Sequence, residues 1–251
     1  FNMEGGIIEG NNASGSGGGV YFGTSVFKMK GGTIEGNTAV KDGGGVYSSN
    51  NSFNMEGGTI EGNTASSNGG GVYSGHGTFN MKGGTIEGNN ADNNGGGVYF
   101  GPDQYYAYYN PMLTMEGGTI EGNTADNNGG GIYVSCYGKN LNMNGGTIGG
   151  PAEDDKNTAV NGGGVYFDGG AFTLAGGIIE SNTATENGGG VLVSTGTFSM
   201  EGGTIEGNAA TENGGGVYII TKDALFNMRG GTIDGNTAAK DGGGIYAEDY
   251  S

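Results

Sequence analysis

A nine-residue phrase, GGTIEGNTA, occupies residues 31–39 and returns at 57–65, followed each time by GGGVYS at the same distance. Aligned on the paired glycines, the chain divides into nine repeats that begin at Phe1, Phe27, Phe53, Phe79, Leu113, Leu141, Phe172, Phe198 and Phe226. Four of the eight steps between these starts are 26 residues, and the others are 28, 28, 31 and 34. A recurring period of this length indicates a solenoid.

The composition has to be read together with this period. With 63 glycines in 251 residues and 33% hydrophobic residues, the chain has too little apolar content for an ordinary layered core. Gly-rich chains are often disordered, but only 3 prolines and a strict repeat argue against disorder here.

Each repeat holds three short apolar stretches, exemplified by Phe53/Met55, Ile60 and Val72, which are separated by glycine clusters or a variable connection. Left-handed hexapeptide coils would need about 18 residues per turn, which is shorter than this period. We therefore predict an all-β fold, a right-handed parallel β-helix in which residues 1–251 form a single domain. It would have nine coils of about 26 residues with three short strands per coil.

In such a solenoid, equivalent residues stack about 4.8 Å apart, so repeated letters become columns of touching side chains. We expect a Met, an Ile and an Ala column to point inward and form the core. The Ile column runs from Ile8 to Ile233 and the Ala column from Ala13 to Ala238. The Met column comprises Met3, Met29, Met55, Met81, Met115, Met143, Met200 and Met228, with Leu174 substituting once.

One Asn recurs in every repeat after the second stretch. Stacked amides can hydrogen-bond along the axis while they shape a turn, so we expect a structural ladder. Its members are Asn11, Asn37, Asn63, Asn89, Asn123, Asn157, Asn182, Asn208 and Asn236.

Two columns carry charge. The first alternates in sign over its first five coils, as Glu4, Lys30, Glu56, Lys82 and Glu116, and is expected to favour the correct register. The second is acidic, with only Gly149 interrupting it: Glu9, Glu35, Glu61, Glu87, Glu121, Glu180, Glu206 and Asp234. Like charges about 5 Å apart repel, so these carboxylates either splay into solvent or bind a hard cation such as calcium. Calcium is the only cofactor that the sequence suggests.

Aromatic residues form a further column, with Val facing inward and Tyr outward: Tyr21, Tyr47, Tyr73, Tyr99, Tyr133, Tyr166, Tyr218 and Tyr246. An outward Tyr stripe would suit contact with a sugar or a protein. The alternative is that the rings cover the adjacent glycine-rich turns.

Two insertions interrupt the repeats. Residues 101–112 carry Tyr105, Tyr106, Tyr108 and Tyr109, a candidate ligand-binding loop on a rigid scaffold. Residues 149–156 offer Glu153, Asp154 and Asp155 as possible cation ligands. Either insertion could also be a tolerated loop.

Several functional classes are disfavoured. A formal charge of −17 disfavours nucleic acid and anionic membranes as partners, and no apolar run approaches the roughly 20 residues of a membrane span. Cys136 and His76 are each the only residue of their type, and neither a nucleophile elbow nor a phosphate loop occurs. Acidic residues recur in almost every coil instead of forming one local constellation, so we predict no catalytic residues and no enzymatic activity.

The succession of GGTIEGNTA and GGGVY resembles the GGA-I and F-x-x-N repeats of chlamydial polymorphic outer-membrane proteins, within the pectin-lyase-like β-helix superfamily. Ile34 stands where F-x-x-N has Phe, ahead of Asn37, and Gly or Thr replaces the Ala of GGA-I. The resemblance implies an adhesin-like β-helix that is extracellular or displayed at the cell surface. Pectate lyases share the fold, but their clustered catalytic Asp, Arg and Lys residues have no counterpart here.

Both ends read as cuts through a continuing pattern, because the first repeat begins at once and the last stops where another Phe is due. We expect a structural surface solenoid that either stacks end-to-end with copies of itself into a fibre or adjoins flanking domains of a longer protein. An adhesin that binds glycan or host protein through the Tyr-rich loop and Tyr column is the second hypothesis. A polysaccharide lyase or hydrolase is the third.

Overall fold

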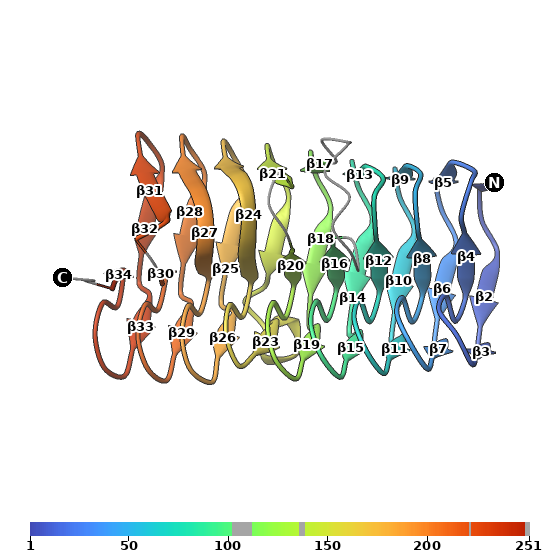
Figure 1. Ribbon diagram of the computed structural model, residues 1–251, viewed down its shortest axis with the longest axis horizontal. Helices are drawn as coiled ribbons and strands as arrows, with labels where there is room; N and C mark the ends of the chain where they lie inside the picture. The colour runs from blue at the N-terminus through green and yellow to red at the C-terminus, as the bar shows by residue number, and fades with distance from the viewer. Residues whose placement is uncertain (102–111, 136–138, 221, 249–251) are drawn as a thin grey trace.

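The computed structural model describes residues 1–101, 112–135, 139–220 and 222–248. The chain winds into a parallel solenoid of nine coils, and the ends of the chain lie at opposite ends of its long axis (Figure 1). Three parallel sheets run the length of this axis, which confirms the predicted all-β parallel β-helix.

Every coil contributes to each sheet. Sheet A contains β1 (Asn2–Met3), β4 (Val20–Phe22), β5 (Phe27–Met29), β8 (Val46–Ser48), β9 (Phe53–Met55), β12 (Val72–Ser74), β13 (Phe79–Met81), β16 (Val98–Phe100), β17 (Met112–Met115), β20 (Ile132–Val134), β21 (Asn140–Met143), β24 (Val165–Leu174), β27 (Val191–Met200), β30 (Val217–Ile219), β31 (Ala224–Met228) and β34 (Ile245–Ala247). Sheet B contains β2 (Ile7–Glu9), β6 (Thr33–Glu35), β10 (Thr59–Glu61), β14 (Thr85–Glu87), β18 (Thr119–Glu121), β22 (Thr147–Gly149), β25 (Ile178–Glu180), β28 (Thr204–Glu206) and β32 (Thr232–Asp234). Sheet C contains β3 (Asn12–Ala13), β7 (Thr38–Ala39), β11 (Thr64–Ala65), β15 (Asn90–Ala91), β19 (Thr124–Ala125), β23 (Thr158–Ala159), β26 (Thr183–Ala184), β29 (Ala209–Ala210) and β33 (Thr237–Ala238).

The strands are distributed among the sheets differently from the sequence expectation. The F-x-M and G-V-Y stretches are separate strands in most coils, as expected, but both belong to sheet A, and in β24 and β27 they merge into one ten-residue strand. The third sheet is built from the two-residue strands at T-A, which were not recognised. Two residues are too few to display the alternation by which a strand is found in a sequence.

Neighbouring coils pair in matched register. Ile34 lies opposite Ile60 and Glu35 opposite Glu61, so each repeated letter does form a column. The expected inward columns are confirmed: Met29, Ile34 and Ala39 are fully buried. The rings of the F-x-M strands add a stack with centroids 4.9 Å apart between Phe53 and Phe79.

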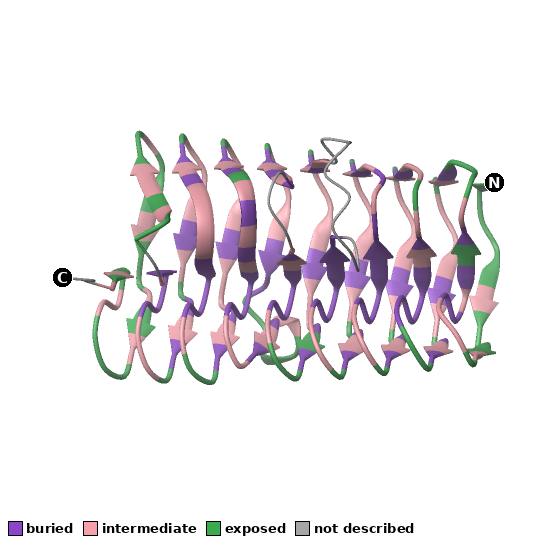
Figure 2. Ribbon diagram, viewed as in Figure 1, coloured by how far each residue is buried: buried purple, intermediate pink, exposed green. Residues whose placement is uncertain are grey.

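Burial weakens at both ends of the solenoid. Purple interior strands give way to pink and green ones in the first and last coils (Figure 2). Met55 has no exposed surface, whereas Met228, in the same column, is 48% exposed because no coil covers it.

The triple glycine of each repeat makes the turn from sheet C back to sheet A. Gly43 has φ of 68°, a left-handed conformation that side chains disfavour. A Cβ on the next residue, Gly44, would lie 2.4 Å from the carbonyl oxygen of Gly70 in the following coil. Glycine is therefore required for coils to stack this closely.

The insertion at 149–156 leaves sheet B after β22 and contains a short 3₁₀ helix, η1 (Glu153–Asp155). Within the described residues, no helix has the length and apolar character needed to span a membrane.

Candidate functional site

The Asn column forms a hydrogen-bonded ladder at the corner between sheets B and C. The Asn63 amide nitrogen donates to the carbonyl of Ile34 at 2.9 Å and to Oδ1 of Asn89 at 3.0 Å. Its own Oδ1 accepts from the backbone and side-chain nitrogens of Asn37. Each such amide thus ties three coils together with its donors and acceptors used, which a buried amide requires.

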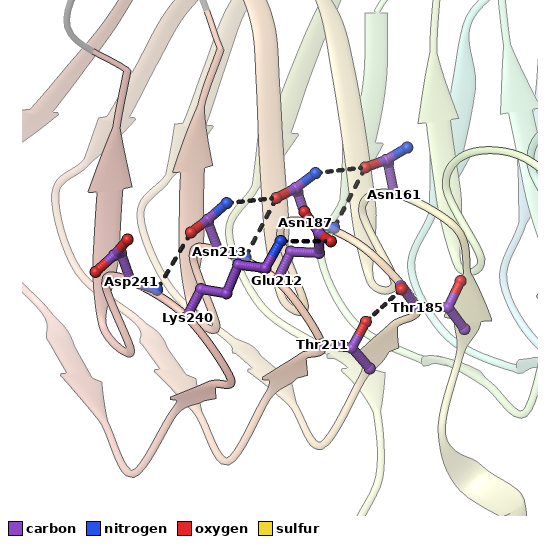
Figure 3. Close-up of polar contacts among 8 residues, drawn as sticks. All are labelled: Asn161, Thr185, Asn187, Thr211, Glu212, Asn213, Lys240 and Asp241. Carbon is purple, nitrogen blue, oxygen red and sulfur yellow. Dashed lines mark hydrogen bonds and ion pairs between the residues drawn. The ribbon is translucent and has the colours of Figure 1, made fainter.

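A second amide ladder lies at the turn before the triple glycine, and the sequence analysis missed it. Nδ2 of Asn213 donates to Oδ1 of Asn187, and Nδ2 of Asn187 donates to Oδ1 of Asn161 (Figure 3). We call it the turn ladder; its positions are Ser16, Asp42, Asn68, Asn94, Asn128, Asn161, Asn187, Asn213 and Asp241. The recurrent Asn directly before GGG was the available signal.

The two ladders have opposite polarity. In the buried ladder the earlier coil donates to the later one, as from Asn11 to Asn37, whereas in the turn ladder the later coil donates, as from Asn68 to Asp42. Asp42 fits this direction because a carboxylate can accept but not donate. Asn68, Asn94 and Asn187 each both donate and accept along the ladder, which requires an amide side chain.

Ion pairs flank the turn ladder and the F-x-M strands. Lys240 contacts Glu212 at 2.7 Å beside the turn ladder (Figure 3), and Lys30 contacts Glu4 at 2.7 Å in the alternating column. The hydrogen bond to Glu4 raises the pKa of Lys30 above its usual range.

The alternating column pairs only in part as expected. The Glu56 carboxylate forms its ion pair with Lys28 on the adjacent strand at 2.8 Å, and its column neighbours Lys30 and Lys82 attract it more weakly, as expected. The hydrogen bond from Lys28 lowers the pKa of Glu56. At the far end, beyond the five alternating coils, Arg229 contacts Glu201 at 3.3 Å.

The acidic column of sheet B does not stop at Gly149. The backbone N–H of Gly88 donates to the carbonyl of Glu121, and in the next coil the N–H of Gly122 donates to the carbonyl of Asp155. The insertion therefore brings Asp155 next to Glu121 in the acidic column, while Gly149 remains the residue that pairs with Glu180 in the sheet, as expected. We call these nine residues the acidic row: Glu9, Glu35, Glu61, Glu87, Glu121, Asp155, Glu180, Glu206 and Asp234.

Burial and neighbouring charge both act on two carboxylates where the insertion meets the row. Desolvation, followed by the negative charges of Asp155 and Glu87, raises the pKa of Glu121. Desolvation, followed by Glu206 and Asp155, raises the pKa of Glu180. Both carboxylates thus hold protons more tightly than they would in an unfolded chain.

A shallow open groove runs beside the first three members of the row and is lined by Glu9, Gly10, Glu35, Gly36, Glu61 and Gly62. Among the described residues, no three acidic, His or Cys side chains come together in a way that could hold a metal ion. Calcium binding by the row stays a prediction. In η1, Glu153 is exposed and pairs with Lys156, and Asp154 is exposed.

The Tyr column forms a ring stack on the outer face of sheet A, opposite the inward Val column. Ring centroids lie 5.0 Å apart between Tyr21 and Tyr47 and 4.8 Å apart between Tyr47 and Tyr73. Tyr21 is 60% exposed, but Tyr73 is only 1% exposed. A Cβ on Gly43 would lie 2.9 Å from Cβ of Tyr47, so the base of the Tyr47 side chain lies against the glycine turn.

The candidate binding residues Tyr105, Tyr106, Tyr108 and Tyr109 lie outside the described residues. Binding of a glycan or host protein by this loop stays a prediction, which its deletion would test.

Two buried polar groups were not anticipated from the sequence. Lys139 is 4% exposed, and its Nζ donates to the carbonyl of Gly75 at 2.7 Å while lying 4.9 Å from the Phe100 ring. Ser74 points into the core, where its hydroxyl has no hydrogen-bond partner among the described residues.

Comparison with known proteins identifies the repeat. Two segments, residues 117–135 and 230–248, match the Chlamydia polymorphic membrane protein repeat. Each runs from the paired glycines through strands of all three sheets, as in β18, β19 and β20. Searches of curated proteins and of solved structures found no match. The resemblance drawn from the sequence is thereby confirmed.

Proposed function

Because the chain carries the Chlamydia polymorphic membrane protein repeat on a parallel β-solenoid, we propose that it is a non-enzymatic structural rod of an extracellular or cell-surface protein. The repeat is named for membrane proteins of Chlamydia, which supports a surface location. A solenoid of stacked coils is suited to span distance, since each coil contacts only its neighbours.

We further propose that the terminal coils are covered by more β-structure, either a second copy or flanking coils of a longer protein. One observation carries this proposal: columns that are fully buried in the interior emerge exposed at both ends. Phe1 is 59% exposed in the first coil, and Met228 and Ile245 are 48% and 41% exposed in the last. Unpaired strand edges with exposed apolar side chains favour pairing with another chain.

A second copy is the occupant that the columns suit. With the last coil of one copy placed before the first coil of the next, Nδ2 of Asn236 would face Oδ1 of Asn11, which continues the polarity of the buried ladder. Arg229 would face Glu4, an oppositely charged pair like Arg229 and Glu201 within the chain. Such a joint repeats head to tail and does not close, so it generates filaments.

Charge reversal tests the joint. Glu4→Lys and Arg229→Glu should each weaken self-association a few-fold by sedimentation velocity, as expected for exposed ion pairs, and the double variant should restore it. Glu116→Lys, an interior substitution in the same column, is the control and should leave association unchanged. Equal effects of all three single variants, or no association of the unmodified chain, would rule out the joint.

A further inference from the structure

The chain contains seven Asn–Gly dipeptides, and six of them lie in the turn ladder: 68–69, 94–95, 128–129, 161–162, 187–188 and 213–214. The seventh, Asn144–Gly145, follows β21 in the column of Glu4 and Lys30. This distribution matters because Asn–Gly is the dipeptide most open to spontaneous deamidation: Gly has no Cβ to obstruct the reaction.

In deamidation, the backbone nitrogen of Gly loses its proton and attacks Cγ of the preceding Asn. A new C–N bond closes a succinimide ring, the bond from Cγ to the side-chain nitrogen breaks, and ammonia leaves. Water then opens the ring to aspartate or isoaspartate. The reaction therefore needs a glycine N–H that can be released and a side chain that can turn toward it.

The turn ladder meets neither requirement: its glycine N–H groups are hydrogen-bonded, and most of its Asn side chains are held in place. The N–H of Gly69 donates to the carbonyl of Asn94 at 3.0 Å, and the N–H of Gly188 donates to that of Asn213 at 3.0 Å. The glycines of the other four pairs donate in the same way, to Asn128, Asn161, Asn187 and Asp241. All six glycines are buried. The amide of Asn94, like most of the ladder, is also tied to Oδ1 of the previous coil.

Asn144–Gly145 lacks this protection. Asn144 is exposed, and within the described chain its side chain makes no hydrogen bond. The Gly145 N–H donates to the carbonyl of Met115 at 3.3 Å, and the Asn144 N–H uses the same carbonyl at 2.8 Å. The attacking nitrogen is thus held by a longer, shared hydrogen bond.

We propose that Asn144 is the deamidation site of this protein and that the solenoid shields the six Asn–Gly pairs of the turn ladder. The modification adds a negative charge one coil beyond Glu116, because Met115 and Met143 pair directly before these residues. An isoaspartate product would also add a methylene to the backbone between β21 and β22. Deamidation would therefore accumulate at Asn144 as the protein ages, while the Asn residues of the turn ladder would keep their amides.

Peptide mapping by mass spectrometry tests the proposal on the full chain held in mildly alkaline buffer. Asn144 should convert at least about tenfold faster than any turn-ladder Asn, the factor given by an opening free energy of about 1.4 kcal/mol. The same incubation in denaturant should make all seven sites convert at similar rates. The Asn144→Gln variant should lose the early acidic species, whereas Asn142→Gln, on the same strand but not followed by Gly, should retain it.

Conversion of a ladder Asn as fast as Asn144 in the folded chain would overturn the proposal. So would an Asn144 that stays unmodified in the folded chain while converting in denaturant. A folded Asn144→Gln variant that still produces the early acidic species would assign the modification to another residue.

Discussion

At the scale of single residues, the buried Asn ladder makes the fold intolerant of change at a polar position. Asn89 is 1% exposed, and its amide makes two hydrogen bonds as donor and two as acceptor. Leucine or alanine at this place could fill space but could satisfy none of these partners. Asn is therefore required at this position of the buried ladder in successive coils.

We expect Asn89→Ala to lower the free energy of unfolding by at least about 2 kcal/mol, because the buried backbone N–H of Asn63 loses its acceptor. Urea unfolding measures the change. Asn80→Ala, which removes a half-buried amide on the outer face that donates to Asn54, should cost much less. Equal losses in the two variants would show that the ladder has no special role.

Ser74 offers the opposite case, a buried hydroxyl without a hydrogen-bond partner among the described residues. Ser74→Ala removes this desolvated group without enlarging the side chain, so we expect the free energy of unfolding to rise by about 1 kcal/mol. Ser48→Ala is the matched control. Its hydroxyl donates to the carbonyl of Asn51 at 2.8 Å, so its loss should destabilise. Stabilisation of both variants alike would refute the assignment.

At the scale of the strands, burial and neighbouring negative charge act together on two members of the acidic row. Glu121 and Glu180 have pKa values raised above the ordinary 4.5. A raised carboxyl pKa means that the folded state binds protons more tightly than the unfolded state, so protonation stabilises the fold. This contribution grows as pH falls from neutral toward the ordinary Glu value and is lost as pH rises through the folded pKa.

We expect Glu121→Gln to raise the melting temperature at pH 7 and to have little effect at pH 4, where the native carboxyl is already protonated. Thermal melts between these pH values measure the difference. Glu35→Gln, far from the insertion, should give a smaller difference. A gain at pH 4 as large as that at pH 7 would contradict desolvation and repulsion of the ionised Glu121 carboxylate as the cause.

Added cations distinguish the two hypotheses for the acidic row, which are that its carboxylates are screened in solvent or that calcium bridges them. If the carboxylates are only screened, NaCl and CaCl₂ at equal ionic strength should raise the melting temperature equally. We expect this result, because the groove beside the row is open to solvent, where the carboxylates can be screened. A larger rise with calcium that Glu61→Gln reduces would establish bridging instead.

Much of the strand arrangement follows from periodicity, and the exceptions have physical reasons. The Met and Ile columns were predictable because a fixed repeat length on a parallel solenoid forces equivalent residues into contact. The third sheet was not, since strands such as Thr38–Ala39 are too short to alternate. The return of Asp155 to the acidic row depends on the path of a loop, which no repeat encodes.

The candidate sites likewise include some that the repeat predicts and some that it does not. The buried ladder could be predicted because its Asn recurs in every coil, whereas the turn ladder was overlooked because glycine dominates the letters around it. The burial of Tyr73 could not be predicted, since alternation gives the face of a sheet but not what covers it.

At the scale of the whole molecule, the solenoid is an open-ended rod. Every interior coil buries its columns against two neighbours, but the first and last coils have one neighbour each. The exposed side chains of Phe1 and Met228 show where these columns lack a covering coil. A rod of this kind gains stability from each coil that is added to it.

Electron microscopy of the purified protein over a range of concentrations tests the proposed role most directly. We expect filaments one solenoid wide with an axial repeat of about 43 Å, the length of nine coils at a rise of about 4.8 Å. Isolated short rods at every concentration would contradict end-to-end association and leave flanking coils of a longer chain as the cover for both ends.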